Sequence, residues 1–233
     1  MDEAVGYRER RSTLLPAVLW RRRCEPGEST VLPDGCMDLI HDGTTIRVAG
    51  PDTRPHVHRT DRPTTLGAIR FAPGVAPIVL GLPASEFRDD RVDLAALVDP
   101  RVRRWIDDAA AAPDPVLALE TLAARELRAA GGPVSWTGAT IAELRHGATV
   151  DAVAADLGLT TRQLHRRCLH HFGYGPKMLQ RILRVRDALP ALRQDTVLSD
   201  SAHLHGFADY PHMVREFRAI TGSTPREIAR PRA

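Results

Sequence analysis

The apolar and polar positions change their period about two-fifths of the way along the chain. The first hundred residues hold short apolar runs broken by turn residues, such as 36–41 and 45–49 on either side of Asp42-Gly43. An Asp-Gly pair between two β-prone runs is typical of a hairpin, because the turn requires positive φ. The run 66–71 is a further predicted strand. Prolines recur too often here for long helices, which predicts a β-rich domain over residues 1–98.

Residues 99–132 show a helical period instead. Segment 102–112 is Ala-rich, and Asp114-Pro115 then offers an N-cap and a first-turn proline to a second helix, which Gly131-Gly132 should end. The apolar face predicted for this second helix consists of Val116, Leu119, Leu122, Ala123 and Leu127. We interpret the segment as a helical connector. It serves either as a dimerisation surface or as packing between two domains.

Residues 133–233 contain an internal repeat. The motif Ala154-x-x-x-Gly158 recurs 48 positions later as Ala202-x-x-x-Gly206, and beyond the turn the spacing becomes 49. The pairs that match at the longer spacing are Thr160 with Asp209, Leu164 with Met213, Arg166 with Arg215, Cys168 with Phe217, Gly173 with Gly222 and Pro176 with Pro225. The one-residue slip falls between the glycine and the helix cap. One supersecondary unit is therefore predicted twice, at 150–172 and 197–221.

Each unit is predicted to be a helix, a Gly-containing turn and a second helix. Leu164, Cys168 and Phe172 would point inward from the second helix of the first unit. This pattern indicates a helix-turn-helix, whose second helix enters the DNA major groove. The amphipathic segment 177–192 would join the units as a rod of roughly 20–24 Å, with Pro190 kinking or shortening its end. Such a rod could hold the recognition helices about one DNA turn apart.

The outward face of these helices carries arginine at matched positions, Arg166 and Arg215. Arginine can fork onto guanine O6 and N7. Arg167, Arg218, Lys177 and the helix N-termini, including Thr161, are better placed for phosphates, which set register and give salt-dependent affinity. The alternative is that these arginines form solvated helix faces, but the same position in two units favours DNA contact.

The net charge becomes informative only when the two halves of the chain are counted separately. The chain of 233 residues has a formal net charge of +3, which by itself indicates no nucleic-acid binder. Residues 1–132 carry −2 and residues 133–233 carry +5, so the positive charge lies in the helical part. The three cysteines form no metal-binding or disulfide pattern. No apolar run approaches about 18 residues, so we expect a cytoplasmic protein without a membrane partner.

The last hundred residues resemble the DNA-binding domain of AraC/XylS-family transcriptional regulators. The resemblance rests on the segments 202–209, 212–217 and 221–225, which read AHLHGFAD, HMVREF and TGSTP. It implies a partner in double-stranded DNA and base-reading positions at Arg162, His165, Arg166, Tyr210, Pro211, His212 and Arg215. Cys168 and Ser201 depart from the usual core residues of the family, and Pro211 cannot hydrogen-bond a base.

Residues in the first half resemble an N-terminal module found before such domains, through the segments 33–39, 50–51 and 67–74. The resemblance implies a sensor or oligomerisation domain for an unnamed small-molecule effector, in a protein that could form a homodimer. The candidate ligand-binding residues are Trp20, Cys36, Asp38, His56, His58 and Arg70. We predict an α+β chain with this sensor domain, the helical connector and an all-α domain of two helix-turn-helix units.

Three functions remain open at this point. A ligand-responsive DNA-binding regulator without a cofactor is favoured. The second is an enzyme, either a cupin-like protein with a metal at His56 and His58 or a DNA-alkyl acceptor using Cys36. No third metal ligand stands at a recognisable spacing, and the chain lacks a Gly-rich phosphate loop and an HExxH motif. The third is a DNA-bridging protein that senses nothing.

Overall fold

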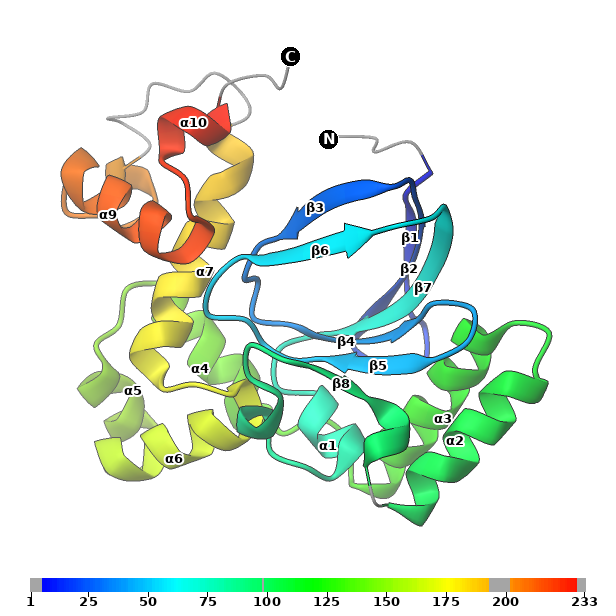
Figure 1. Ribbon diagram of the computed structural model, residues 1–233. Helices are drawn as coiled ribbons and strands as arrows, with labels where there is room; N and C mark the ends of the chain where they lie inside the picture. The colour runs from blue at the N-terminus through cyan, green and yellow to red at the C-terminus, as the bar shows by residue number, and fades with distance from the viewer. Residues whose placement is uncertain (1–5, 98, 193–201, 230–233) are drawn as a thin grey trace.

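The computed structural model describes residues 6–97, 99–192 and 202–229. The chain is α+β, with an N-terminal β-rich part and a C-terminal part made only of helices (Figure 1). This confirms the predicted fold class. The strands are β1 (Arg8–Arg11), β2 (Ala17–Cys24), β3 (Gly27–Val31), β4 (Met37–His41), β5 (Ile46–Ala49), β6 (His56–Thr60), β7 (Thr64–Phe71) and β8 (Arg91–Asp93).

Six of these strands form one antiparallel sheet in the order β1-β2-β7-β4-β5-β8. The other two, β3 and β6, pair with each other and face β4 and β5 across the interior of the domain (Figure 1). The inner face of each strand carries every second residue, because successive side chains in a strand point to opposite sides. The space between the two sheets is therefore lined by alternate residues from nearly all the strands.

The predicted hairpin joins β4 and β5, although its loop is longer than a two-residue turn. Asp42 accepts hydrogen bonds from the backbone N–H groups of Thr44 (3.0 Å) and Thr45 (2.9 Å), which closes a loop over residues 42–45. Of the described non-glycine residues only Asp89 has positive φ, and in this loop Gly43 alone adopts it. The carboxylate of Asp42 thus stabilises the turn through these hydrogen bonds, without a second residue at positive φ.

The predicted connector packs on the N-terminal sheet. Its helices are α2 (Pro100–Ala111) and α3 (Pro115–Ala129), and α3 begins at the Asp114 cap as predicted. The predicted apolar face of α3 is buried in one core with the strands and with α1 (Ala76–Leu80) and the short 3-10 segments η1 (Ala84–Phe87) and η2 (Leu94–Ala96). A Cβ atom on Gly67 of β7 would lie only 2.7 Å from the side chain of Val116, so glycine there lets α3 approach the sheet.

A second core belongs to the C-terminal helices. They are α4 (Ser135–Arg145), α5 (Val150–Asp156), α6 (Thr161–Phe172), α7 (Pro176–Leu192), α9 (Tyr210–Thr221) and α10 (Pro225–Ala229). One side of helix α7 is buried in this core. Its buried residues include Leu179, Ile182, Leu183, Val185, Ala188 and Leu192. Its described part runs through Pro190 to Leu192, so the proline does not end the helix. Positions 197–201 of the second predicted unit, including Ser201, lie outside the described residues.

The sequence repeat corresponds to a repeated structure. In the first unit the backbone N–H of Leu159 donates to the carbonyl of Ala154 (2.8 Å), and in the second Phe207 donates to Ala202 (2.9 Å). After these turns, Thr160 and Asp209 cap α6 and α9. Both helices end at a glycine in the left-handed region, Gly173 at φ 80° and Gly222 at φ 72°. The buried core positions that match are Leu164 with Met213 and Cys168 with Phe217.

The one-residue slip lies where the sequence predicts it. The turn bonds of the two units match at a spacing of 48, whereas the caps match at 49. The second unit therefore has one more residue, Ala208, between its turn and its cap. The N–H of Ala208 donates to Nδ1 of His212 (3.1 Å), which satisfies the inserted backbone group.

Candidate nucleic-acid interface and effector pocket

The arginines of α6, the first predicted recognition helix, are exposed to solvent. Thr160 and Gln163 form a capping box, in which each side chain accepts a hydrogen bond from the other residue's backbone N–H. Leu164, Cys168 and Phe172 hold the opposite face in the core. Thr161, Arg162, His165, Arg166 and Arg167 are all exposed. Every α6 residue predicted to contact DNA is therefore accessible.

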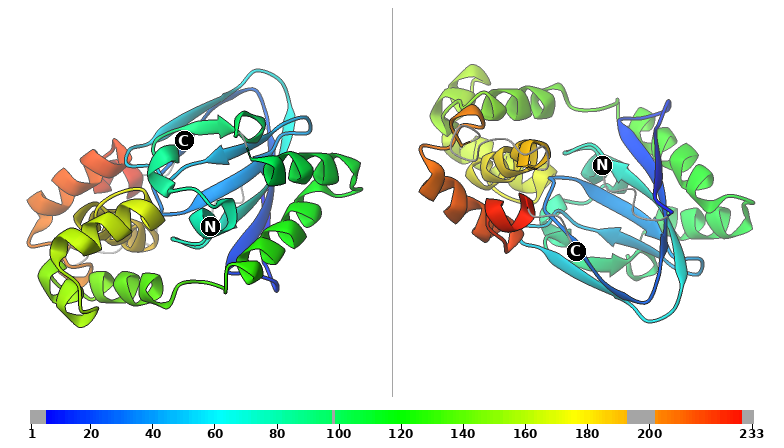
Figure 2. Two further views of the ribbon diagram at one scale, coloured as in Figure 1. Left: turned by 90° about the horizontal axis from the view of Figure 1, so that it is seen from below. Right: turned by 90° about the horizontal axis from the view of Figure 1, so that it is seen from above.

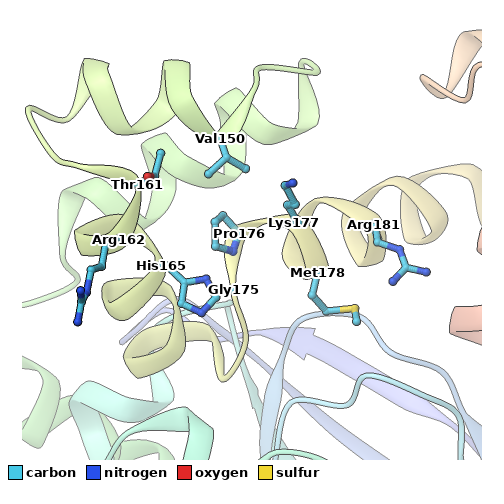
Figure 3. Close-up of a pocket in the computed structure, with 9 residues that line it drawn as sticks. All are labelled: Val150, Thr161, Arg162, His165, Gly175, Pro176, Lys177, Met178 and Arg181. Carbon is cyan, nitrogen blue, oxygen red and sulfur yellow. The ribbon is translucent and has the colours of Figure 1, made fainter.

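A cleft of about 690 Å³ opens beside α6. It is lined by Val150, Thr161, Arg162, His165, Gly175, Pro176, Lys177, Met178 and Arg181, from the first turn of α5, the first half of α6 and the start of α7 (Figure 3). The ring of His165 covers Gly175, where an added Cβ would meet it at 2.5 Å. Lys177 is exposed in the first turn of α7. Predicted base-reading and phosphate-contacting residues thus share one concave surface.

Arg167 lies away from this cleft. Its guanidinium carbon is 5.9 Å from the centre of the Trp136 ring on α4, a cation–π distance. The same ring meets His171 edge-on, with ring centres 5.1 Å apart. Arg167 therefore helps to hold α4 against α6 while its charge stays at the surface, where a phosphate could reach it.

The second recognition helix, α9, exposes Pro211, Arg215 and Arg218. Tyr210 and His212 are only half-exposed, because Tyr210 packs on the helical core and His212 turns back to accept the Ala208 N–H. In the neutral ring that bond leaves Nε2 of His212 as a donor. Of the predicted positions on α9, Arg215 is thus the exposed arginine that matches Arg166 of α6.

A groove of about 700 Å³ joins the two units across α7. It contains three cations of α7 at helical spacing, Lys177, Arg181 and Arg184. Arg181 also bonds Glu216 of α9 (2.8 Å), and this ion pair ties the second unit to the linking helix. Arg181 and Arg184 were not among the predicted DNA contacts, although Lys177 of the same helix was. Their spacing of four and three residues along one helix face was the signal available.

The β-rich domain encloses a pocket of about 330 Å³ between its two sheets. Five of the six candidate ligand residues line it: Trp20, Asp38, His56, His58 and Arg70. They come from β2, β4, β6 and β7, which no sequence spacing connects. Sequence reasoning missed other lining residues, among them Tyr7, Arg22, Arg47, Leu66 and Arg91.

An ion pair crosses the floor of this pocket. Asp38 and Arg70 are direct partners in the β4–β7 register, and Arg70 Nε donates to Asp38 Oδ1 at 3.2 Å. Arg70 Nε also lies 3.7 Å from a carboxylate oxygen of Asp34. Burial raises the pKa of Asp38 to about 6, although Arg70 acts to lower it. Burial disfavours the charge on Arg70, but Asp38 and Asp34 together raise its pKa above the ordinary value.

His56 and His58 point into the pocket from alternate positions of β6. Burial, together with the charge of Arg91, lowers the pKa of His56. Arg91 itself is held by the buried Asp52 at 2.6 Å. Among the described residues, no group of three or more His, Cys, Asp or Glu side chains could hold a metal ion. The histidine pair therefore lacks the third ligand that a cupin-like site needs.

Cys36 does not line the pocket, which corrects its place among the candidate ligand residues. It lies one residue before β4, on the side of the strands that faces the helical domain, with Arg186 among the charges around it. Burial and the neighbouring Asp34 and Asp38 raise the pKa of its thiol. The thiolate, which is the nucleophilic form, is thus disfavoured. This is the opposite of what an alkyl acceptor needs.

The two domains meet at Asp34 and at Tyr174, the second residue after α6. Arg186 of α7 donates to the backbone carbonyl of Asp34 (2.9 Å). Tyr174 is buried, its hydroxyl has no hydrogen-bond partner among the described residues, and burial raises its pKa. Gly173 packs against Pro51 and η1. In both views of Figure 2, α7 passes beside the strands. Asp34 therefore touches the pocket's ion pair and the linking helix at once.

Comparison with known proteins settles the nature of the helical domain. Residues 153–231 match the model of a helix-turn-helix domain family. The C-terminal domain is an AraC-type helix-turn-helix domain. The helical part of the chain is accordingly of a DNA-binding type. Residues 17–93 match a domain family of unknown function (DUF6597). A search of curated proteins gave no match.

Among solved structures, the chain is similar to ToxT from Vibrio cholerae. The apo form of a ToxT variant from strain SCE256 has 8% sequence identity and a TM-score of 0.48, covering 94% of this chain and 98% of that chain. ToxT from Vibrio cholerae O395 has 9% identity and a TM-score of 0.46, covering 96% and 97%. Unsaturated fatty acid-bound ToxT has 8% identity and a TM-score of 0.44, covering 97% and 95%.

No helix in the described residues is both long and apolar enough to cross a membrane.

The raised pKa of Asp38 gives a testable dependence of stability on pH. An aspartate in an unfolded chain titrates near 4, so the folded protein binds this proton more tightly. The resulting stabilisation is fully present below about pH 4 and is lost as the pH rises through about 6. Between pH 4 and 7 we expect the unmodified chain to lose about 2 kcal/mol of unfolding free energy relative to Asp38→Asn.

Urea denaturation at half-unit pH steps measures this difference. The exposed Asp61, replaced by asparagine, is the control and should keep the slope of the unmodified chain. Parallel stability curves for the unmodified chain and Asp38→Asn would contradict the assignment of the titration to Asp38.

Proposed function

We propose that the chain is a sequence-specific transcriptional regulator whose AraC-type domain reads two successive major grooves and whose β-rich domain binds a small-molecule effector. The observation that carries the first part is the pair Arg166 and Arg215. They occupy the same position on two helices whose caps, cores and C-terminal glycines match, and both are exposed. Two equally placed arginines on paired recognition helices favour guanine contacts over solvated surface charge.

The remaining cations suit a backbone role. Lys177, Arg181 and Arg184 line the groove between the units, and Arg218 lies in the last turn of α9. Phosphate contacts from such residues hold the protein in register and release counterions. Helix α7 has 17 residues and spans about 25 Å, a length that suits units placed on one face of a duplex.

An effector role for the β-rich domain is supported by the pocket and by its connection to α7. The site is concave, lies between two sheets and is lined by apolar side chains together with arginine, aspartate and histidine side chains that converge on it. Small-molecule sites commonly combine concave apolar surface with converging polar groups. Asp34 accepts from Arg186 through its carbonyl and lies beside Arg70 through its carboxylate. A ligand that displaces Arg70 would therefore disturb a residue bonded to the linking helix. A homodimer and a cytoplasmic location remain predictions.

Removing either matched arginine tests the base-reading role. We expect Arg166→Ala and Arg215→Ala each to weaken binding to the preferred DNA site by about 1–3 kcal/mol, because a bidentate base contact is lost. The site is first selected from random duplexes, and affinity is then measured by fluorescence anisotropy. Both side chains are exposed, so circular dichroism should stay unchanged. Arg103→Ala, an exposed change on α2, is the control; unchanged affinity in both test variants would refute the assignment.

Phosphate contacts predict a different signature. Lys177→Gln and Arg218→Gln should weaken binding to the selected site and to random DNA by the same factor. Each should also reduce the slope of log K against log salt concentration by about 1, since one fewer counterion is released. Titrations at several salt concentrations measure both quantities. A loss confined to the selected site would instead assign these residues to base reading.

The domain junction predicts coupled unfolding. Because Tyr174 and Arg186 join the helical domain to the strands, we expect the unmodified chain to unfold in one calorimetric transition. The double variant Tyr174→Ala, Arg186→Met should show two. Tyr174→Phe keeps the packing and removes only an unpartnered buried hydroxyl, so it should cost no stability. One transition in the double variant would place the coupling elsewhere.

A further inference from the structure

One loop of the β-rich domain meets both helix-turn-helix units. Residues 50–55, with the sequence GPDTRP, connect β5 to β6, and we call them the bridging loop. A Cβ atom added to Gly173, the residue that ends α6, would lie 2.4 Å from Cγ of Pro51. One added to Gly222, which ends α9, would lie 3.5 Å from Cγ of Pro55. Because the two glycines are matched positions of the repeat, the loop meets the same point of each unit.

The two contacts differ in depth. Gly173 is buried, its added Cβ would also come within 3.1 Å of the Ala84 carbonyl oxygen in η1, and its own carbonyl accepts a hydrogen bond from Arg88 (3.4 Å). Gly222 stays exposed, and Pro55 is half-buried. The first unit is therefore seated on the β-rich domain, whereas the loop reaches the second unit from one side.

The bridging loop is braced from within the β-rich domain. Both carboxylate oxygens of Asp52 accept hydrogen bonds from Arg91, at 2.9 and 2.6 Å. The backbone N–H and the hydroxyl of Thr53 donate to the Asp89 carboxylate, each at 2.7 Å. The two prolines restrict φ, and the four residues from one to the other reach at most about 14 Å. The loop thus holds its two contacts a short and nearly constant distance apart.

A contact at this place acts on the angle between the two units. Within the described residues the second unit also packs on α7, where Arg181 bonds Glu216 of α9 (2.8 Å). A unit that rests on one helix can turn about it, and a second contact on another element opposes that rotation. Each base pair inserted between two half-sites moves the second groove by about 3.4 Å and turns it by about 35°. The angle between α6 and α9 therefore decides which half-site spacing both helices can read.

We propose that the bridging loop determines the half-site spacing that the protein selects, by fixing the second unit relative to the first. This inference rests on the proposed reading of two major grooves and adds a specificity determinant that lies outside the AraC-type domain. Pro55 is a positioning residue, because it contacts the end of α9 and acts on DNA through that helix. Its loss should change the choice of spacing and leave the choice of bases unchanged.

A series of half-site spacings tests the role of the loop on the full chain. The preferred duplex is selected from random sequences, and the gap between its two half-sites is then shortened or lengthened by one and by two base pairs. Fluorescence anisotropy gives the dissociation constant for each duplex. We expect the unmodified chain to lose about tenfold or more in affinity for a change of one base pair, because the two units can no longer engage together.

Loosening the loop should broaden the range of spacings that bind. Pro55→Gly removes the ring that meets Gly222 and frees the backbone of the loop. We expect it to bind the preferred duplex within about threefold of the unmodified chain, and to lose less than about threefold for a change of one base pair, because the second unit can turn to follow the groove. Thr53→Val removes the hydroxyl bond to Asp89 and keeps both prolines, so it should broaden the range by less.

Pro63→Gly is the matched control. Pro63 is exposed between β6 and β7, and Figure 1 shows this turn at the opposite end of β6 from the bridging loop. The same chemical change there should keep the spacing profile of the unmodified chain. All the variants should bind a duplex with a single half-site as tightly as the unmodified chain does, an affinity that general damage to the fold would lower.

The outcomes separate the role of the loop from the reading of two grooves. If Pro55→Gly keeps the spacing profile of the unmodified chain, the loop sets no spacing, and the reading of two grooves still stands. If Pro55→Gly binds more tightly at every spacing, the loop opposes DNA binding and the inference is overturned. If selection yields no duplex with two half-sites, the reading of two grooves falls and the inference falls with it.

Discussion

Asp38 and Arg70 stand opposite each other on β4 and β7, and the ion pair between them lies in the pocket and next to the domain junction. The pair is largely buried, so breaking it would leave an uncompensated charge between two sheets, a cost of several kcal/mol. The carboxylate of Asp34 lies beside the same arginine, Arg70, and its backbone carbonyl accepts a hydrogen bond from Arg186 of α7. One residue, Asp34, thus links the linking helix to the charged groups of the pocket.

In the helical domain, the residues that stabilise the fold are different from those proposed to contact DNA. Caps, turn bonds and C-terminal glycines repeat in both units, and the cores under α6 and α9 bury the same positions. These features fix the backbone without using the exposed face, so Arg166 and Arg215 stay exposed, as the proposed contact with DNA requires. Arginine suits this role because its rigid fork matches the guanine edge, whereas lysine acts as a point charge. The chain contains a single lysine, Lys177, and it lies in the groove between the units.

Most of the helical domain could be read from local sequence. Thr160 and Asp209 as caps, Leu164 and Cys168 as core positions and the slip between turn and cap all follow from neighbours a few residues apart, where helix geometry leaves little freedom. The Asp42-Gly43 hairpin was predictable for the same reason, although its four-residue loop was not, since the carboxylate of Asp42 closes it. Arg181 and Arg184 were missed, although they stand at helical spacing from Lys177.

By itself the sequence determined the two kinds of domain, the repeated helix-turn-helix and the matched arginines, because helix and turn preferences act over short distances. What the β-rich domain encloses depends instead on how its strands pair in three dimensions. Trp20, Asp38, His58 and Arg70 reach one pocket because their strands pair in a particular order, whereas Cys36 falls outside it and Arg22 falls inside. Strand order brings Trp20 together with Arg70, 50 positions later in the chain, and no local preference specifies such long-range pairing.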